Sequence, residues 1–365
     1  MTEETAEGNV TAPTTLDRMR RVEKAREGNG RARLTLLDIA RLAGVSRTTA
    51  SRVLNGRGEV SATVRARVES VIAETGYRPL ASAQSLVSHR TGVIGFVIPI
   101  GTAALFQDPY FGTLLKGISH ASAQMNLAVA LFLFEEDSDQ NGLIDRVVGP
   151  RRVDGIIMSA YHTRDSLLDR LADFDVPTVT MGPNRSPEIF GSVQVDNRQG
   201  GVLAGRRLVS AGCRRVALIG GPENTPSGAE RNEGFRAAIE EGGLDLPAER
   251  VRIGDYTEKT GEALGRELLR EDFDGIFVAS DVMALGAMRA LRSAGRRVPE
   301  DVSVVGFDDL ELAALSEPPL TTIWQPITEM ASAALEMLLA QIDDPGSVHH
   351  LVLPVELVER ASTRS

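Results

Sequence analysis

The chain has 365 residues, a hydrophobic content of 42% and a formal net charge of −10. This length and composition predict a globular protein made of a small domain and one larger α/β module. A single cysteine, Cys213, excludes an intramolecular disulfide framework. No apolar run reaches the roughly 18 residues of a membrane span. The polar N-terminal stretch lacks the apolar core of a signal peptide, so we expect a cytoplasmic protein without membrane contact.

The charge is unevenly distributed along the chain. Residues 34–90 contain eight Arg and four Asp or Glu, which gives this segment a net charge of +4. The part that follows is therefore strongly acidic. A basic segment in front of an acidic body favours contact with phosphates at one place only, with an affinity that depends on salt. Residues 1–33 have no sustained apolar face and predict a flexible extension.

Two short helical patterns joined at Gly44 predict a helix-turn-helix unit. Thr35 can cap the first helix, because the carboxylate of Asp38 three residues later can reach back to the cap amide. Gly44 supplies the backbone freedom that ends this helix sharply. Ser46 is expected to cap a second helix that runs to about Asn55.

The outward face of the second predicted helix is short, polar and cationic. It consists of Arg47, Thr48, Ser51, Arg52 and Asn55. Side chains of this kind donate to base edges in a major groove and to neighbouring phosphates. An ordinary solvated helix pair is the alternative. A third helix predicted over about 62–74, capped by Ser61 and closed by Gly76, favours the DNA-binding interpretation because three helices make a headpiece.

The segment from Thr35 to about Leu86 resembles the headpiece and hinge of the LacI/GalR (lactose-repressor/galactose-repressor) family of bacterial transcription regulators. The family pattern Val-Ser-x-x-Thr-Val-Ser-Arg-Val-Leu-Asn matches residues 45–55, with one departure at Ala50. The resemblance implies that Arg47 and Thr48 set specificity and that Arg52 reads a base. It also implies phosphate contacts from Ser46, Thr49, Ser51 and Asn55.

The resemblance extends to a hinge. Residues 34–79 would form the headpiece and residues 80–91 the hinge helix and linker. The family motif Pro-Asn-x-x-Ala-x-x-Leu is matched by Pro79, Ala83 and Leu86, whereas Leu80 stands where Asn is usual. The resemblance implies that Ala83 and Leu86 belong to the DNA contact, with Leu86 wedged between base pairs from the minor groove.

From Gly92 onward, apolar runs of strand length alternate with amphipathic helices. These runs cover residues 93–98, 128–134, 155–158 and 178–181 in a first series and residues 215–220, 275–278 and 302–307 in a second. Continuous apolar runs are typical of buried parallel strands. The pattern predicts a two-lobed, periplasmic-binding-protein-like core of two doubly wound parallel sheets. We expect one lobe over about 92–191 and 322–341, and the other over about 192–321 and 350–361.

Polar and aromatic residues that follow the predicted strands are candidates for a binding cleft, because ligands of open parallel sheets bind at the carboxyl ends of the strands. They are Asp108 to Phe111, Arg231, Ser280 and Asp281, and Asp308 and Asp309. Aromatic rings stack on a sugar or a base, an arginine forks onto hydroxyls, and a carboxylate accepts from hydroxyls. Alternatives remain open: Tyr110 and Phe111 as core, Arg231 as a brace between lobes, and Asp308 as a loop cap.

Three segments of the core, residues 280–286, 298–309 and 318–322, are similar to signature blocks of the same family. The resemblance implies effector-binding roles for Tyr110, Phe111, Arg231, Tyr256, Ser280 and Asp308. Thr225 stands where purine-binding members have arginine, which favours a carbohydrate or related polyol over a purine. Because a single headpiece contacts too few bases for selective binding, we expect a homodimer on a palindromic double-stranded operator, and the sequence indicates no cofactor or metal.

The sequence disfavours two other classes of protein, an enzyme and a transport binding protein. The sequence offers no phosphate-binding loop, no nucleophile elbow and no His/Cys cluster at metal spacing, which speaks against an enzyme. His349 and His350 would point to opposite faces of a strand. A transport binding protein shares the two-lobed cleft but not the headpiece. The sequence therefore predicts a DNA-binding regulator, most simply a repressor, whose operator affinity is changed by a ligand between the lobes.

Overall fold

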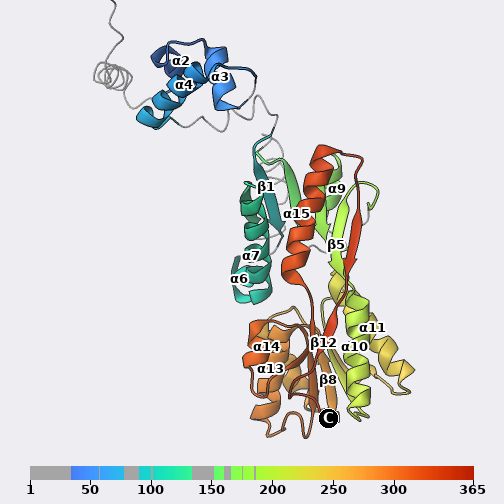
Figure 1. Cartoon of the computed structure of the whole chain (residues 1–365). Helices are drawn as coiled ribbons and strands as arrows, with labels where there is room; N and C mark the ends of the chain where they lie inside the picture. Colours follow the sequence, from blue (N-terminus) through green and yellow to red (C-terminus); the bar gives the residue numbers. More distant parts are fainter. Residues whose placement is uncertain are drawn as a thin grey trace, which may run out of the picture. The chain divides into compact units, whose positions relative to one another are not determined.

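The computed structural model describes residues 34–56, 58–77, 90–99, 102–133, 152–159, 166–174, 176–184 and 186–365. The chain divides into two compact units, and the second begins at Arg90 (Figure 1). The predicted N-terminal extension and the hinge positions Ala83 and Leu86 lie outside the described residues.

The first unit contains three helices, α2 (Leu36–Leu42), α3 (Arg47–Leu54) and α4 (Ala62–Thr75). The predicted capping box at the start of α2 is confirmed: the Thr35 hydroxyl accepts from the Asp38 N–H, and the Asp38 carboxylate accepts from the Thr35 N–H at 2.9 Å. The pKa of Asp38 is lowered mainly by its hydrogen bond with the Thr35 side chain. Gly44, with φ of 64°, makes the turn into α3.

The three helices enclose a small apolar core. Its buried members are Ile39, Ala43, Val53, Val68 and Val71. Gly76 ends α4 with φ of 61°, in the left-handed conformation that glycine adopts without strain. Ser61 occupies the N-cap position of α4, but its side chain makes no capping hydrogen bond. The packing therefore fixes α3 against the other two helices by one face only.

The first lobe of the second unit is built on a six-stranded, fully parallel sheet in the order β11-β5-β4-β3-β1-β2. Its strands are β1 (Val93–Ile98), β2 (Ala128–Leu133), β3 (Gly155–Met158), β4 (Thr178–Met181), β5 (Gly191–Val195) and β11 (His350–Leu353). Its described helices are α6 (Thr102–Gln107), α7 (Pro109–Gln124), α9 (Ser166–Ala172) and α15 (Ile327–Asp343). Helices α7 and α15 pack side by side on the sheet (Figure 1).

The second lobe repeats this arrangement with strand order β12-β10-β9-β8-β6-β7, in which β12 alone is antiparallel. Its strands are β6 (Val216–Gly220), β7 (Val251–Ile253), β8 (Gly275–Val278), β9 (Ser303–Asp308), β10 (Thr321–Trp324) and β12 (Glu356–Val358). Its helices are α10 (Asn197–Ser210), α11 (Pro226–Glu241), α12 (Glu258–Leu268), α13 (Asp281–Ser293) and α14 (Glu311–Leu315), with a short 3₁₀ turn η2 (Ala248–Arg250).

Among the described elements, the chain passes between the two sheets three times: after β5, after β10 and after β11. The expected lobe boundaries therefore differ from the observed ones. Residues 192–195, expected in the second lobe, belong to β5 because they pair with β4 in the first sheet. β11, also expected in the second lobe, pairs with β5. Conversely, β10 pairs with β9 in the second sheet.

No helix in the described part of the chain is both long and apolar enough to cross a membrane.

Candidate functional sites

Helix α3 presents the predicted DNA-reading side chains. Arg47, Thr48, Arg52 and Asn55 are exposed, whereas Ala50 on the opposite face is fully buried. Neither Arg47 nor Arg52 forms an ion pair with a described carboxylate, so both guanidinium groups remain available for an anionic partner.

The polar residues at the two ends of α3 are joined by local hydrogen bonds. The Ser46 hydroxyl accepts from the Thr49 N–H at 3.0 Å and lies 2.8 Å from the Thr49 hydroxyl. Asn55 Nδ2 donates to the Ser51 hydroxyl at 3.2 Å. These bonds hold the start and the last turn of α3 in a defined shape, while the exposed N-terminus of the helix supplies backbone donors suited to phosphate.

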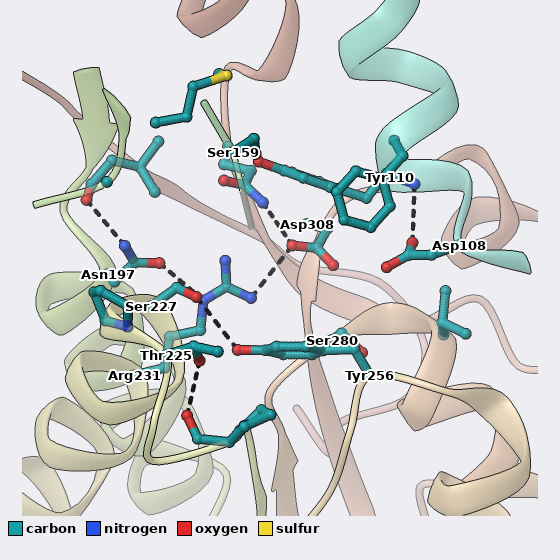
Figure 2. Close-up of a pocket in the computed structure, with 18 of the residues that line it drawn as sticks. Asp108, Tyr110, Ser159, Asn197, Thr225, Ser227, Arg231, Tyr256, Ser280 and Asp308 are labelled. Atoms are coloured by element: carbon teal, nitrogen blue, oxygen red, sulfur yellow. Dashed lines mark hydrogen bonds and ion pairs between the residues drawn. The ribbon is translucent and has the colours of Figure 1, made fainter. Parts of the chain in front are cut away.

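The second unit contains a cavity of about 530 Å³ at the carboxyl ends of the strands of both sheets (Figure 2). All six predicted effector-binding residues line it: Tyr110, Phe111, Arg231, Tyr256, Ser280 and Asp308. The structure thus brings together side chains that the sequence separates by up to about 200 positions. Thr225 also lines the cavity, and its hydroxyl caps α11 by accepting from the Gly228 N–H at 3.2 Å.

Arg231 is the central cation of this cavity and is only 6% exposed. Its Nε donates to Asn197 Oδ1 at 2.9 Å, and its Nη1 donates to the carbonyl oxygen of Ala279 at 2.8 Å and to Asp308 Oδ1 at 3.4 Å (Figure 2). The guanidinium carbon lies 3.5 Å from the ring centroid of Phe307. Nη2 has no partner among the described residues and remains to donate to a ligand.

Glycines on neighbouring helices set the backbone position of Arg231. A Cβ at Gly201 of α10 would lie far inside van der Waals contact with the Arg231 carbonyl oxygen, and one at Gly234 of α11 would overlap the carbonyl of Arg198. Helices α10 and α11 therefore approach more closely than any larger residue would allow. This close packing fixes where Arg231 enters the cavity.

Asp308 ends β9 and points its carboxylate at the same space (Figure 2). Oδ1 accepts from Gln325 Nε2 at 2.6 Å as well as from Arg231. Burial raises the pKa of Asp308 to about 7; the Arg231 charge opposes this shift and Asp108 adds to it. Asp308 has φ of 111° and the following Asp309 has φ of 54°, both in the left-handed region that disfavours residues with a Cβ.

Asp281 braces this strained turn from behind. Its carboxylate accepts from the Leu310 N–H at 2.9 Å and from the Thr322 hydroxyl at 2.5 Å, and the residue is fully buried. Burial raises the pKa of Asp281 well above its usual range. Asp281 follows its strand as the sequence indicated, yet it is not part of the cavity wall; its neighbour Ser280 is. The Ser280 hydroxyl also caps α13, accepting from the Met283 N–H at 3.3 Å.

Aromatic rings from both lobes border the cavity. Asp108 caps α7 by accepting from the Tyr110 N–H at 2.9 Å, and Phe111 packs edge-on against Tyr110 with ring centroids 5.2 Å apart. Phe111 is 8% exposed, so it belongs to the core and to the cavity wall at once. Tyr256, with φ of 67°, comes from the second lobe and lies across the cavity from Tyr110 (Figure 2).

The sequence did not identify the amides that line the cavity, and three of them, Gln194, Asn197 and Gln325, share a similar place in the sheets. Asn197 and Gln325 hold Arg231 and Asp308, and all three lie on or just after β5 or β10. The rule that ligands bind at strand ends could have found them. The apolar pattern does not mark these strands, because they contain Ser, Gln and Thr and do not form uninterrupted apolar runs.

The paired histidines near the chain end form local bonds. His350 Nδ1 lies 2.8 Å from the Ser192 hydroxyl, its Nε2 lies 3.0 Å from the Pro187 carbonyl oxygen, and His349 lies 2.9 Å from the Ser347 hydroxyl. Both histidines are exposed. Within the described ranges, no group of three or more His, Cys, Asp or Glu is arranged to hold a metal ion.

Comparison with known proteins covers both the helix-turn-helix unit and the unit that contains the cavity. Residues 35–79 match the model of bacterial regulatory proteins of the lacI family, and residues 206–363 match a periplasmic binding protein-like domain. The HTH-type transcriptional regulator CelR of Thermobifida fusca is 38% identical over 340 residues, covering 91% of this chain and 99% of the relative. The ribose operon repressor of Escherichia coli is 33% identical over 332 residues, covering 90% and 99%.

Solved structures agree. A complex of the transcriptional regulator CelR with cellobiose matches with a TM-score of 0.72 at 36% identity, covering 90% of this chain and all of that one. The lac repressor dimer bound to operator and the anti-inducer ONPF matches with a TM-score of 0.81 at 30% identity, covering 92% and 100%. These relatives are regulators and not enzymes, and they span both units described above. The chain belongs to the lacI family of bacterial regulatory proteins and is a DNA-binding transcription regulator controlled by a small ligand.

Proposed function

We propose that this regulator is a repressor that acts in the cytoplasm, binds a palindromic operator as a homodimer, and changes its operator affinity when a sugar binds between its lobes. The exposed face of α3 supports the DNA-binding role, with Arg52 reading a base and Arg47 and Thr48 setting specificity. A pair of headpieces is needed because one short helix contacts too few bases for selective binding.

The observation that carries the sugar assignment is the arrangement of the cavity wall. Tyr110 from the first lobe and Tyr256 from the second lie on opposite sides of the space, and Arg231 and Asp308 also line it (Figure 2). A sugar ring offers flat C–H faces to aromatic rings and hydroxyls to a cation–carboxylate pair. Because each lobe supplies one ring, a bound sugar favours the lobe arrangement in which both rings contact it.

The size of the cavity favours a disaccharide. About 530 Å³ lies well within the range of pockets that enclose ligands larger than a single hexose. The relative CelR was solved with cellobiose, whereas another relative is named for the ribose operon. We therefore propose a β-linked glucose disaccharide such as cellobiose as the effector, ahead of a pentose.

Titration of the purified chain with cellobiose, ribose and hypoxanthine tests this proposal. A ligand that binds only the folded state raises the unfolding midpoint with its concentration, so cellobiose is expected to give the largest shift. The Arg231→Ala variant should lose the shift and still bind DNA. A larger shift with hypoxanthine, or an undiminished shift in Arg231→Ala, would contradict the proposed effector site.

The regulatory half of the proposal is tested on DNA. Selection from random duplexes should return a palindrome with two half-sites about one helical turn or more apart. Adding cellobiose should change the affinity for that duplex at least several-fold, and the direction of the change distinguishes an inducer from a corepressor. Recovery of no preferred sequence, with or without the sugar, would argue against the operator role.

A further inference from the structure

Gln194 combines two features that set it apart from the other polar residues of the cavity. It lies in β5 of the first lobe and forms part of the cavity wall. Its Oε1 is enclosed and has no hydrogen-bond partner. Its Nε2 also bonds to no described residue, but it is not among the enclosed atoms, so it remains accessible. The terminal amide of Gln194 is therefore without any partner in the described part of the protein.

An amide in this position is costly to the free protein. Buried polar groups in proteins are almost always hydrogen-bonded, and leaving one without a partner costs more than a typical hydrogen bond contributes. A leucine at position 194 would bring no polar atom into this enclosed place, so the amide is costly here unless it finds a partner. Two further amides of the wall, Asn197 and Gln325, are engaged with Arg231 and Asp308 respectively.

We propose that Gln194 is a specificity-determining residue that hydrogen-bonds a hydroxyl of the effector from the first lobe. This inference rests on the proposed function, because it names a further contact of the same sugar. A terminal amide carries a donor and an acceptor, and rotation about its last side-chain bond exchanges the two. A hydroxyl can satisfy either one. Gln194 thus gives the first lobe a polar contact that complements the Arg231–Asp308 pair of the second.

This contact would let the protein distinguish sugars that carry the bonded hydroxyl from sugars that lack it. A site built to hydrogen-bond a hydroxyl rejects an analogue that lacks it, because the amide is then left desolvated and unpaired. One lobe alone, through Arg231 and Asp308, can hold one part of the sugar. A bond from Gln194 to another hydroxyl makes affinity depend on both lobes at once, and so on the lobe arrangement that sets DNA affinity.

The chain offers a matched control for the test. Gln341 of α15 also has an enclosed Oε1 without a partner, but its Nε2 donates to the Ile189 carbonyl oxygen at 3.0 Å and it does not line the cavity. Gln194→Leu and Gln341→Leu therefore remove the same kind of group, inside and outside the site. The full-length variants would be titrated calorimetrically with cellobiose and with its monodeoxy derivatives.

Gln194→Leu is expected to weaken cellobiose binding about tenfold, the loss of one buried hydrogen bond, while Gln341→Leu leaves it unchanged. One deoxy derivative should bind wild type more weakly than cellobiose does, yet bind Gln194→Leu no more weakly, because the two changes remove the same contact. Unchanged cellobiose affinity in Gln194→Leu, or losses that add for every deoxy derivative, would overturn this inference alone. A wild-type chain that binds no sugar would contradict the proposed function and this inference together.

Discussion

At the scale of single residues, the inner wall of the cavity places one buried cation next to a buried acid. Arg231 contacts Asp308 at 3.4 Å, and Asp281 and Asp108 lie close enough to influence the charge on Asp308 or to be influenced by it. One guanidinium cannot fully stabilise several carboxylates in a dry site. The raised pKa of Asp308, about 7, follows mainly from burial of its carboxylate, and the nearby Asp108 adds to it.

Effector binding should therefore depend on pH near neutrality. A sugar hydroxyl that donates to Asp308 prefers the ionised carboxylate, so the bound state lowers a pKa that is about 7 in the free protein. By linkage, affinity should rise with pH and gain about tenfold between pH 6 and pH 8. Calorimetric titrations across this range, with Asp308→Asn as the non-titrating control, would measure the effect. An affinity that is flat or falls with pH would contradict this role of Asp308.

Arg52 carries the sharpest prediction for the headpiece. It is exposed on α3 without a described carboxylate partner, so Arg52→Ala should weaken operator binding by about 1–3 kcal/mol per half-site and relax the preference for one base. Fluorescence anisotropy with operator and base-substituted duplexes would measure both effects. Arg67→Ala, which removes an exposed cation of α4, should weaken all duplexes alike. If Arg52→Ala also weakened binding to all duplexes alike, Arg52 would not read a base.

At the scale of elements, the sequence predicts buried strands well and strands with polar or exposed residues poorly. β1, β3 and β8 begin and end at the expected residues because each is an uninterrupted apolar run, and β4 does so because its two threonines are buried, as is the apolar residue between them. β10, Thr321–Trp324, and the short or edge strands β7, β11 and β12 carry polar or exposed residues, and their pairing is decided by distant segments. Of the cavity residues missed by the sequence, Gln325 follows β10, whereas Gln194 lies in β5 and Asn197 comes just after it; β5, Gly191–Val195, also carries polar residues.

The helix pair α10–α11 provides a test of how packing positions the site. In Gly201→Ala the new methyl group would overlap the Arg231 backbone, which cannot move aside, so we expect about 1–3 kcal/mol of destabilisation and a clear loss of effector affinity. Gly112 of α7 has open space around its Cα, so Gly112→Ala should stabilise the protein by about 0.5–1 kcal/mol. Urea unfolding of both variants would measure the change in stability, and sugar titration would measure the change in effector affinity. Unchanged effector affinity in Gly201→Ala would mean that Arg231 is not held by this packing.

At the scale of the whole molecule, charge separates the two units. The segment over 34–90 has a net charge of +4 within a chain of −10. Attraction to the phosphate backbone is therefore confined to the first unit, while the second opposes it.

Operator affinity should consequently fall steeply with salt. Each phosphate neutralised by the headpiece contributes a slope of about −0.9 to a plot of the logarithm of affinity against that of salt concentration. Binding to a random duplex should show a similar slope at a lower affinity, because phosphates are common to both duplexes and base contacts are not. Measurements between 50 and 200 mM salt, a range in which such effects are large, would establish the slope. A slope near zero would exclude the phosphate contacts assigned to α3.

The last two strands have a consequence for building hybrid regulators. β11 completes the sheet of one lobe and β12, only a few residues later, completes the sheet of the other. Neither lobe can thus be cut out as a continuous stretch of chain, and a ribosome must translate through both strands before either sheet can close. Sensor modules of this design should be grafted whole, at the junction in front of Arg90, because a splice inside the core would strip an edge from both halves.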